Sequence, residues 1–192
     1  MMNKFECRQK MKAKLSLLDE QAIQNKSVLL SKNLSHLLVS ELYVIQKKLV
    51  LGLYAPLDKE PRWNCLLPEF RFTAFPSFEK TATMMTFKLS SLEGLECKDD
   101  FGVKILGPLQ ECPVVIPDVI ILPGLAFSKS GERLGRGKGF YDKYLSNFSG
   151  VKVGVCFSDQ LEEEIPTESH DIVLDYIVTE NEIINCKVKG AS

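Results

Sequence analysis

Short apolar runs rich in β-branched residues constrain the fold of this chain most. The segments DVIILPG (118–124) and KVGVCF (152–157) lack the alternation of apolar and polar residues that marks a strand with one face in water, and DYIVTE (175–180) is similar. Continuous runs of this kind are typical of parallel strands that helices cover on both faces. They predict an α/β fold built around a buried sheet.

The rest of the pattern fits helical layers around that sheet. Residues 3–17 are rich in helix formers, and Asp19 is a suitable N-cap for a second helix that reaches about Val39. We expect this second helix to face the core with its apolar positions. These positions include Ile23, Val28, Leu29 and Leu37.

Shorter apolar segments complete the expected sheet. KKLVLGLYAP, RFTAFPSF and TMMTFKLS predict further strands, whereas residues 90–108 are the most loop-like segment. A chain of 192 residues with 45% apolar residues is long enough for one real core. We therefore expect a single domain, residues 1–192, with a three-layer α/β/α, Rossmann-like architecture and a mostly parallel central sheet.

Composition narrows the function. A net charge of −1 argues against a general nucleic-acid binder, which carries a broad basic surface. The six cysteines form no C-x-x-C pair, and only His36 and His170 could help them bind zinc, so we expect reduced thiols and a cytoplasmic protein. The longest apolar run (113–127) is interrupted by prolines and Asp118, and the first residues lack the apolar core of a signal peptide. We expect neither a membrane segment nor a nucleic-acid partner.

One stretch combines glycines with cations. In GERLGRGKGFYDKYL (131–145), four glycines are interleaved with three cations, between the strand at 118–124 and a helix predicted from the apolar spacing of residues 141–148. Ligands of open α/β sheets bind at this edge, where glycines let backbone N–H groups converge on phosphate oxygens. The stretch predicts a phosphate site, although its spacing is not that of a Walker A loop. A solvated, flexible basic loop is the alternative.

Asp142 directly follows this stretch. A carboxylate beside a phosphate site would repel the ligand unless a cation lay between them. Mg²⁺ is commonly held by one or two carboxylates together with nucleotide phosphates, so Asp142 is a candidate magnesium ligand. The simpler interpretation is an acidic residue in the first turn of a helix, where the helix dipole favours it.

The segment LPGLAFSKSGERLGRGKGFYDKYL (122–145) resembles the signature of the 5-formyltetrahydrofolate cyclo-ligase family, PG-[LV]-A-F followed by G-x-R-L-G-x-G-x-G-[YF]-Y-D. The resemblance extends to Lys4 and Arg8 in a Lys-x-x-x-Arg motif, to LYAPLDKE ending at Glu60, and to ESHDIVLDYIVTE near the end. It covers the chain from end to end but is weak between about residues 62 and 112.

The resemblance implies an activity and its partners. Members of the family use ATP and Mg²⁺ to convert 5-formyltetrahydrofolate into 5,10-methenyltetrahydrofolate, with release of ADP and phosphate. The formyl oxygen attacks the γ-phosphate, and a neighbouring folate nitrogen then closes the ring and expels phosphate. The chemistry needs positioning and charge neutralisation rather than a protein nucleophile. The resemblance further implies a monomer with a fold of the sugar-phosphate isomerase and CoA-transferase type, and leaves open a preference for polyglutamylated folate.

It also implies roles for individual residues. Arg136 and Lys138 would be catalytic, and Asp142 and Asp171 would hold Mg²⁺. The implied ATP contacts are Lys4, Arg8, Arg133, Leu134, Gly135, Arg136, Gly137, Lys138, Gly139, Phe140 and Tyr141. The implied folate contacts are Tyr54, Glu60, Arg136, Gly137, Lys138, Gly139 and Phe140. Without the resemblance, the two N-terminal cations would be interpreted as a solvated helix face and Asp171 as a turn residue.

One departure from the family pattern follows Glu60. The family usually has another acidic or polar residue there and then threonine, whereas this chain reads Glu60-Pro61-Arg62-Trp63. The folate-facing wall is therefore expected to differ. Trp63 would either stack on the pterin or fill the core.

Two other classes of protein share part of this sequence pattern or the expected fold. RGKGFYDKY partly resembles the RNP1 strand of an RNA-recognition motif, but it fails at three of the RNP1 positions and keeps helical spacing. A sugar-phosphate isomerase or an acyl transferase would have a similar fold and need no ATP. Thermal stabilisation by ATP, with and without Mg²⁺, separates these classes.

Overall fold

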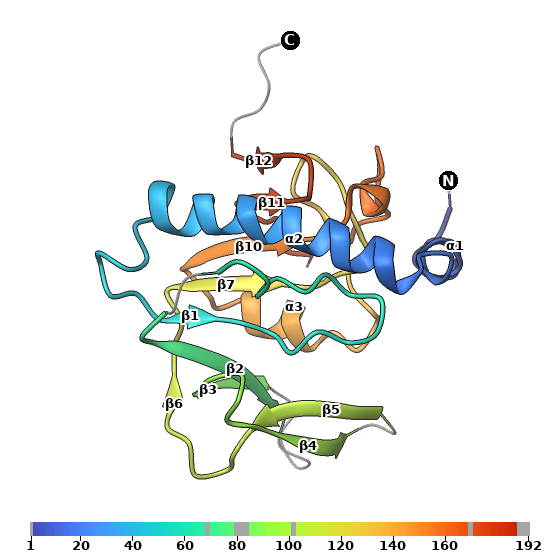
Figure 1. Cartoon of the computed structure of the whole chain (residues 1–192). Helices are drawn as coiled ribbons and strands as arrows, with labels where there is room; N and C mark the ends of the chain where they lie inside the picture. The colour runs from blue at the N-terminus through green and yellow to red at the C-terminus, as the bar shows by residue number, and fades with distance from the viewer. Residues whose placement is uncertain (1, 68–69, 79–84, 101–102, 169–170, 188–192) are drawn as a thin grey trace.

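The computed structural model describes residues 2–67, 70–78, 85–100, 103–168 and 171–187 and is built around one large sheet (Figure 1). The strands of this sheet are β1 (Leu51–Gly52), β2 (Thr73–Phe78), β3 (Met85–Leu89), β6 (Val114–Val115), β7 (Val119–Leu122), β10 (Val151–Val155), β11 (Tyr176–Val178) and β12 (Ile183–Asn185). Their spatial order is β12-β11-β10-β7-β1-β2-β3-β6. The five strands β11, β10, β7, β1 and β2 are parallel to one another, whereas β12, β3 and β6 pair antiparallel with their neighbours. The predicted mostly parallel sheet is confirmed.

Strand β7 lies at the centre of this sheet and separates two apolar clusters. Val119 and Ile121 belong to one cluster of buried side chains, and Ile120 and Leu122 belong to the other. Because successive side chains of a strand point to opposite faces, the two clusters lie on the two sides of the sheet. The continuous apolar run in the sequence therefore reflects burial on both faces, as expected.

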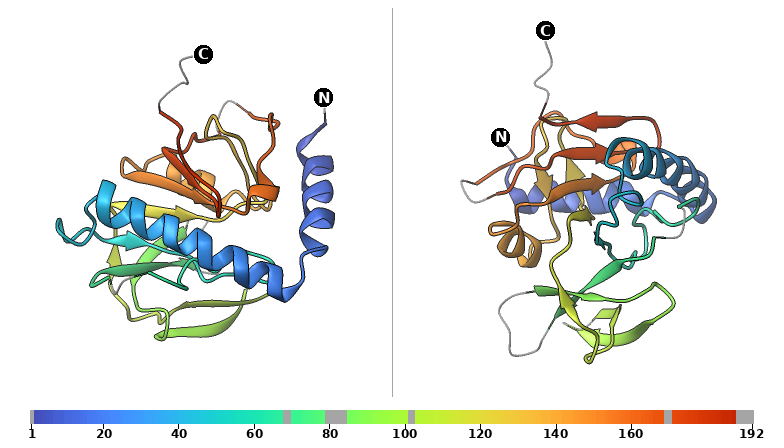
Figure 2. Two further views of the ribbon diagram at one scale, coloured as in Figure 1. Left: turned by 45° about the horizontal axis from the view of Figure 1, so that its top comes forward. Right: turned by 90° about the vertical axis from the view of Figure 1, so that its left-hand side faces the viewer.

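Helices cover both faces. The cluster that contains Val119 also contains buried residues of α1 (Lys4–Ser16) and α2 (Glu20–His36), and the opposite cluster contains Leu145 of α3 (Phe140–Leu145). The views in Figures 1 and 2 show α2 lying along one face, with α1 turning away from its beginning and α3 on the opposite face. The three-layer arrangement is confirmed.

Side-chain caps define the two N-terminal helices. Asn3 and Glu6 form a reciprocal capping box at the start of α1. At the start of α2, the Asp19 side chain accepts a hydrogen bond of 2.7 Å from the backbone N–H of Ala22, as predicted.

The core face of α2 includes Ile23, as expected from the sequence, but not Leu29. Its buried residues are Ile23, Ser27, Leu30, Ser31 and Leu34. Leu29 is 52% exposed, so its predicted core position is wrong. The helical period that places Leu30 and Leu34 against the sheet turns Leu29 outward. After α2, the chain continues in a π-helical turn, η1 (Leu37–Glu41), whose Leu37 is buried as predicted.

The segment 90–108 is not a loop. It contains β4 (Leu95–Asp100) and β5 (Val103–Pro108), which pair antiparallel as a hairpin at the lower end of the molecule in Figure 1. The loop prediction was wrong because it relied on continuous apolar runs, which mark strands that are buried on both faces. β4 and β5 project from the large sheet and are held by pairing with each other, so they need no such run.

The glycine-rich stretch is likewise more structured than a single loop. β8 (Ala126–Phe127) pairs with β9 (Arg133–Leu134), and Gly131, with φ of 94°, lies in the connection between them. The loop that leads into α3 is therefore Gly135–Gly139, here called the glycine loop. A short 3₁₀ turn, η2 (Ser158–Gln160), follows β10.

Two further expectations concern the whole chain. Within the described ranges, no helix is long and apolar enough to cross a membrane. All six cysteines are free thiols, and Cys7 and Cys156 are buried. His170, which was considered with the cysteines, lies outside the described residues.

Candidate active site

Two cavities meet at the glycine loop. The first, of about 320 Å³, is here called the apolar cavity and is lined by Tyr54, Ala55, Leu57, Glu60, Pro76, Phe78, Ile105, Leu106, Pro123, Gly124, Arg133, Gly135, Arg136, Gly137, Lys138, Gly139, Phe140, Tyr141 and Asp142. The second, of about 630 Å³, is here called the polar cavity and is lined by Asn3, Lys4, Phe5, Arg8, Arg133, Leu134, Gly135, Gly137, Gly139, Asp142, Pro166, Thr167, Glu168 and Asp171. The shared lining residues are Arg133, Gly135, Gly137, Gly139 and Asp142. The glycine loop is therefore a thin wall between two different environments.

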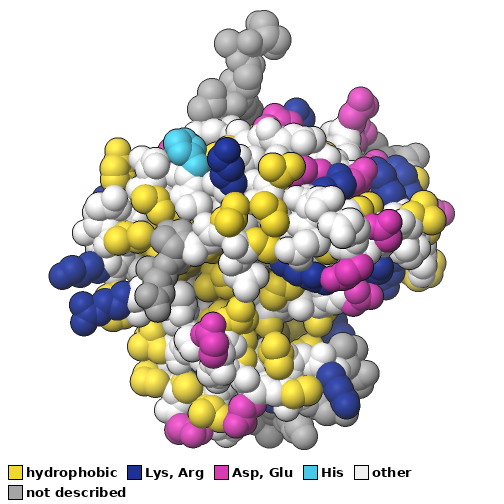
Figure 3. Space-filling view, viewed as in Figure 1, with side chains coloured by type: hydrophobic (Ala, Val, Ile, Leu, Met, Phe, Trp, Pro, Cys, Tyr) yellow, Lys and Arg dark blue, Asp and Glu magenta, His cyan; other side chains and the backbone are white. Residues whose placement is uncertain are grey.

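Aromatic and aliphatic side chains form one side of the apolar cavity. The rings of Phe78 from β2 and Phe140 from α3 lie 5.0 Å apart between centroids, and Ile105 and Leu106 of the β4–β5 hairpin complete this side. In the space-filling view, apolar side chains gather where the lower part of the molecule meets the main body (Figure 3). Such a lining suits a flat, partly apolar ring system.

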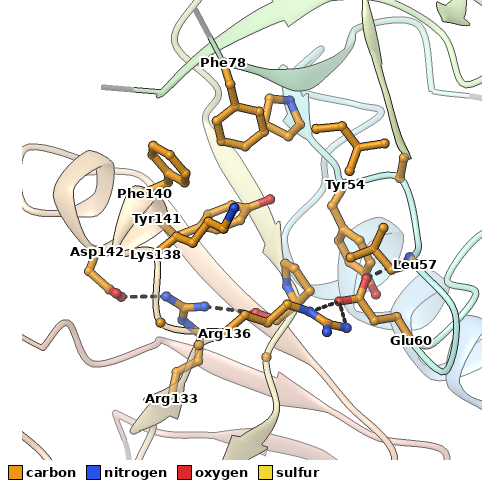
Figure 4. Close-up of a pocket in the computed structure, with 18 of the residues that line it drawn as sticks. Tyr54, Leu57, Glu60, Phe78, Arg133, Arg136, Lys138, Phe140, Tyr141 and Asp142 are labelled. Atoms are coloured by element: carbon orange, nitrogen blue, oxygen red, sulfur yellow. Dashed lines mark hydrogen bonds and ion pairs between the residues drawn. The ribbon is translucent and has the colours of Figure 1, made fainter. Parts of the chain in front are cut away.

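Polar groups face this apolar side. Arg136 donates from Nε and Nη2 to Glu60 Oε1, at 2.9 and 2.7 Å, and the backbone N–H of Leu57 donates to Glu60 Oε2 at 2.9 Å (Figure 4). The Glu60 side chain is 7% exposed and that of Arg136 is 41% exposed. The pair links the segment after β1 to the glycine loop and places a buried carboxylate, with an arginine, in the lining.

Tyr54 and Trp63 lie behind the Glu60 segment. The Tyr54 hydroxyl donates to Pro61 O at 2.9 Å, and Trp63 Nε1 donates to Tyr54 O at 2.8 Å. Burial, and then the nearby Glu60 carboxylate, raise the pKa of Tyr54 well above its ordinary value of 10. Trp63 is buried and packs against Phe75 at 6.5 Å between ring centroids. Of the two roles considered for Trp63, the structure shows the core-filling one.

The polar cavity contains the two N-terminal cations. Lys4 Nζ donates to Asp171 Oδ2 at 2.7 Å and lies 3.3 Å from Glu168 Oε2. Burial alone would lower the pKa of Lys4, but the hydrogen bonds to these carboxylates raise it above its ordinary value. Arg8 Nε donates to Gly135 O at 3.0 Å. These side chains of α1 therefore reach the cavity instead of forming a solvated face.

Arg133 and Asp142 stand at the boundary of the two cavities. Arg133 Nη2 donates to Asp142 Oδ1 at 2.5 Å, and Nη1 donates to Pro123 O at 3.0 Å. Burial raises the pKa of Tyr141 above its ordinary value, the Glu60 carboxylate adds to this rise, and Arg133 opposes it. Asp142 is the acid in the first turn of α3, and its partner is a buried arginine.

The cavities divide the residues implied to contact ATP. Lys4, Arg8 and Leu134 line the polar cavity, and Arg133, Gly135, Gly137 and Gly139 line both cavities. Arg136, Lys138, Phe140 and Tyr141 line the apolar cavity. Every implied folate contact lines the apolar cavity as well.

Sequence reasoning missed the far wall of the apolar cavity. Pro76 and Phe78 come from β2, and Ile105 and Leu106 come from the segment that was predicted to be a loop. A proline and ordinary apolar residues in short strands carry no chemical signal. Only the folding of the β4–β5 hairpin against the site shows their position.

Both candidate magnesium ligands line the polar cavity. Asp142 is paired with Arg133 and Asp171 with Lys4. In the part of the chain that the structure describes, no group of three or more His, Cys, Asp or Glu could hold a metal ion. Because Mg²⁺ needs only one or two carboxylates when phosphates supply further oxygens, this donor set fits a metal that arrives with a phosphorylated ligand.

A mostly parallel α/β fold with glycines, cations and two carboxylates beyond the end of β7 is typical of phosphate-binding α/β enzymes. Comparison with known proteins specifies the family: the model of the 5-formyltetrahydrofolate cyclo-ligase family matches residues 1–180. The chain belongs to this family.

Individual relatives agree with this assignment. The chain is 44% identical over 64 residues to a 5-formyltetrahydrofolate cyclo-ligase of Mycolicibacterium smegmatis, covering 32% of this chain and 33% of the relative. It is 40% identical over 88 residues to that of Escherichia coli K12, covering 42% and 48%. The matched segments thus span less than half the length of these two relatives.

A solved structure is similar over the whole chain. The structure of Aquifex aeolicus 5,10-methenyltetrahydrofolate synthetase superposes with a TM-score of 0.80 at 31% sequence identity and covers 100% of this chain and 96% of that one.

Proposed function

We propose that this protein uses ATP to cyclise 5-formyltetrahydrofolate to 5,10-methenyltetrahydrofolate, with release of ADP and phosphate. The observation that carries the proposal is the thin wall between the cavities. A cation-lined cavity and an aromatic cavity share Gly135, Gly137 and Gly139, so ligands on the two sides can meet where no side chain intervenes. A reaction between a nucleotide and a flat organic ring needs this arrangement.

The cavities divide the substrates by chemistry. The triphosphate lies in the polar cavity, where Lys4 and Arg8 offset its charge. The pterin lies in the apolar cavity against the paired rings of Phe78 and Phe140, and Glu60 accepts hydrogen bonds from its ring N–H groups. Arg136 and Lys138 border the point where the two substrates meet.

The reaction proceeds in two displacements. The formyl oxygen attacks the γ-phosphorus and ADP leaves with the electrons of the broken P–O bond. The neighbouring folate nitrogen then attacks the formyl carbon, the C–O bond breaks to release phosphate, and the proton of that nitrogen passes to the departing phosphate or to water. The phosphoryl group passes directly between the two substrates, so the reaction needs no nucleophile from the protein. The task of Arg136 and Lys138 is to stabilise the charge of the transferred phosphoryl group.

Mg²⁺ fits the polar cavity as a partner of the nucleotide. Asp142 and Asp171 would hold it, and bound metal would neutralise phosphate charge. Their present partners, Arg133 and Lys4, compensate the charge of these two carboxylates.

The decisive test is direct. Protein is mixed with ATP, Mg²⁺ and 5-formyltetrahydrofolate, and methenyl absorbance is followed while each component is omitted in turn. We expect product only with all of them, and one ADP per methenyl group. Lys129→Ala, which removes an exposed ion pair with Glu182, is a matched control that should retain full activity. Absence of product from the folded protein, or product without ATP, contradicts the proposal.

Thermal stabilisation separates the other classes of protein. ATP with Mg²⁺ at about 100 times its Kd should stabilise the fold by about 2.7 kcal/mol, whereas an isomerase or acyl transferase should show no such effect. Stabilisation by RNA instead would favour an RNA-binding module.

We also propose that the protein is a monomer. Because all six cysteines are free thiols, we place it in a reducing compartment, the cytoplasm. Size-exclusion chromatography and cell fractionation test these two points. Methenyl formation with monoglutamylated and polyglutamylated substrate tests chain-length preference.

A further inference from the structure

The guanidinium of Arg133 is held by the protein itself. Its side chain is 4% exposed, and it donates to Pro123 O at the end of β7 and to Asp142 Oδ1 in the first turn of α3. Its centre also lies 5.5 Å from the ring centroid of Tyr141. Figure 4 shows Arg133 below the glycine loop with its hydrogen bond to Asp142.

Two glycines leave room for this side chain. A Cβ atom at Gly124 would lie 3.2 Å from Arg133 Cγ, and a Cβ atom at Gly135 would lie 3.2 Å from Nη1. Both distances are shorter than ordinary van der Waals contact. Gly124 therefore leaves room for the aliphatic part of the Arg133 side chain, as well as for the Phe127 ring, and Gly135 leaves room for its guanidinium.

This setting differs from that of the other arginines of the site. Arg136 is 41% exposed and faces Glu60 across the apolar cavity. Arg8 approaches the glycine loop from α1 through Gly135 O. Of these three arginines, only Arg133 has a guanidinium that contacts the end of a central strand, the first turn of α3 and an aromatic ring.

We propose that Arg133 is a positioning residue, which fixes the Asp142 carboxylate and the Tyr141 ring, rather than a ligand of the ATP phosphates. The inference rests on the proposed function because it assigns Asp142 to the metal that accompanies ATP. The planar guanidinium holds two acceptors in fixed directions, which a lysine ammonium cannot do. Residues that orient a metal ligand commonly change metal affinity about 10- to 100-fold when they are replaced.

The two roles predict different binding curves. ATP affinity is measured by calorimetry for wild type and Arg133→Lys while Mg²⁺ is raised from zero. For a positioning residue, the Mg²⁺ midpoint rises about tenfold and ATP affinity at saturating Mg²⁺ returns to that of wild type. For a phosphate ligand, the affinity at saturating Mg²⁺ stays low. Arg8→Lys, at a proposed phosphate contact, is the matched control and should show the second pattern.

An unchanged midpoint in folded Arg133→Lys, or a lasting loss of affinity at saturating Mg²⁺, overturns the positioning role. A wild-type protein that binds no ATP contradicts the proposed function instead.

A second measurement is independent of ATP. Melting temperatures of Arg133→Met, Asp142→Asn and the double variant form a cycle. If Arg133 holds Asp142, the double variant loses less than the sum of the two single losses. Additive losses show that the two side chains are uncoupled and overturn the inference, whatever the protein is found to bind. If Arg133→Met does not fold, Arg133→Lys replaces it in the cycle.

Discussion

Arg136 donates two hydrogen bonds to one oxygen of Glu60, a residue 76 positions earlier in the chain. The contact joins the glycine loop to the segment after β1, and both side chains line the apolar cavity. Arg136, which is proposed to stabilise the transferred phosphoryl group, is therefore held by Glu60, which is proposed to bind the folate. This relationship makes the first prediction specific.

Arg136→Ala should affect activity and stability together. It leaves the buried Glu60 carboxylate without two donors, which should lower the free energy of unfolding by about 1–3 kcal/mol, and it should reduce methenyl formation about 100-fold or more. Adding Glu60→Gln should recover most of the stability, because no buried charge is left, but not the activity. Denaturant unfolding and the absorbance assay measure the two effects. Wild-type turnover in a folded Arg136→Ala variant would contradict a catalytic role.

Asp142→Asn tests the metal site. If Asp142 holds Mg²⁺ with the ATP phosphates, turnover should fall by orders of magnitude, and high Mg²⁺ should partly rescue it. If Asp142 only favours the start of α3, the loss of stability stays under about 1 kcal/mol and activity survives. Methenyl formation across a magnesium titration distinguishes the two, with the melting temperature as the control for folding.

Two glycines of the loop should respond differently to alanine. Gly137 has φ of 101°, a conformation that alanine rarely adopts, and a Cβ there would lie 3.4 Å from Arg8 Cζ. Gly139 has φ of 69° and ψ of 6°, and its Cβ would meet nothing within 4 Å. We expect Gly139→Ala to cost about 1 kcal/mol of stability and keep ATP binding, and Gly137→Ala to weaken ATP binding at least about tenfold. Equal ATP affinities would show that the shape of the loop at Gly137 is unimportant.

Phe78→Ala should affect only the folate side. The ring lines the apolar cavity and packs on Phe140, so its removal should raise the KM for 5-formyltetrahydrofolate about tenfold through a lost aromatic contact of about 1–1.5 kcal/mol. ATP binding in calorimetry should not change. A KM increase for ATP alone would reverse the proposed assignment of the two cavities.

Acid stability should depend on Glu180. Burial alone would raise the pKa of Glu180, but hydrogen bonds from Lys26 and Ser158 hold it below its usual value of 4.5. A carboxyl with a lowered folded-state pKa stabilises the protein above pH 4.5, and this contribution is lost as the pH falls through the folded-state value. Glu180→Gln should cost about 2 kcal/mol at pH 7 and flatten the fall of stability below pH 4.5. Denaturant unfolding between pH 7 and pH 3 measures both. Parallel curves for variant and wild type would refute this role.

The sequence alone was sufficient to predict the layers and to propose the glycine-rich stretch as the centre of the site. Burial of β7 on both faces requires an uninterrupted apolar run, and this requirement is local, so the parallel sheet could be inferred. Asp19 caps its own helix through a residue three positions away. The glycines and cations of residues 131–142 indicated a phosphate site for the same reason: backbone freedom and charge are properties of the residues themselves.

Only the tertiary structure decided which residues lie opposite the glycine loop. The β4–β5 hairpin supplies Ile105 and Leu106 to the apolar cavity. It was predicted as a loop because its strands pair with each other and need no apolar pattern of their own. Trp63 fills the core, where Tyr54 O accepts a hydrogen bond from its Nε1–H. The buried guanidinium of Arg133 and the link from Arg136 to Glu60 depend on distances between segments far apart in the chain. Such contacts arise from packing, and no local pattern encodes them.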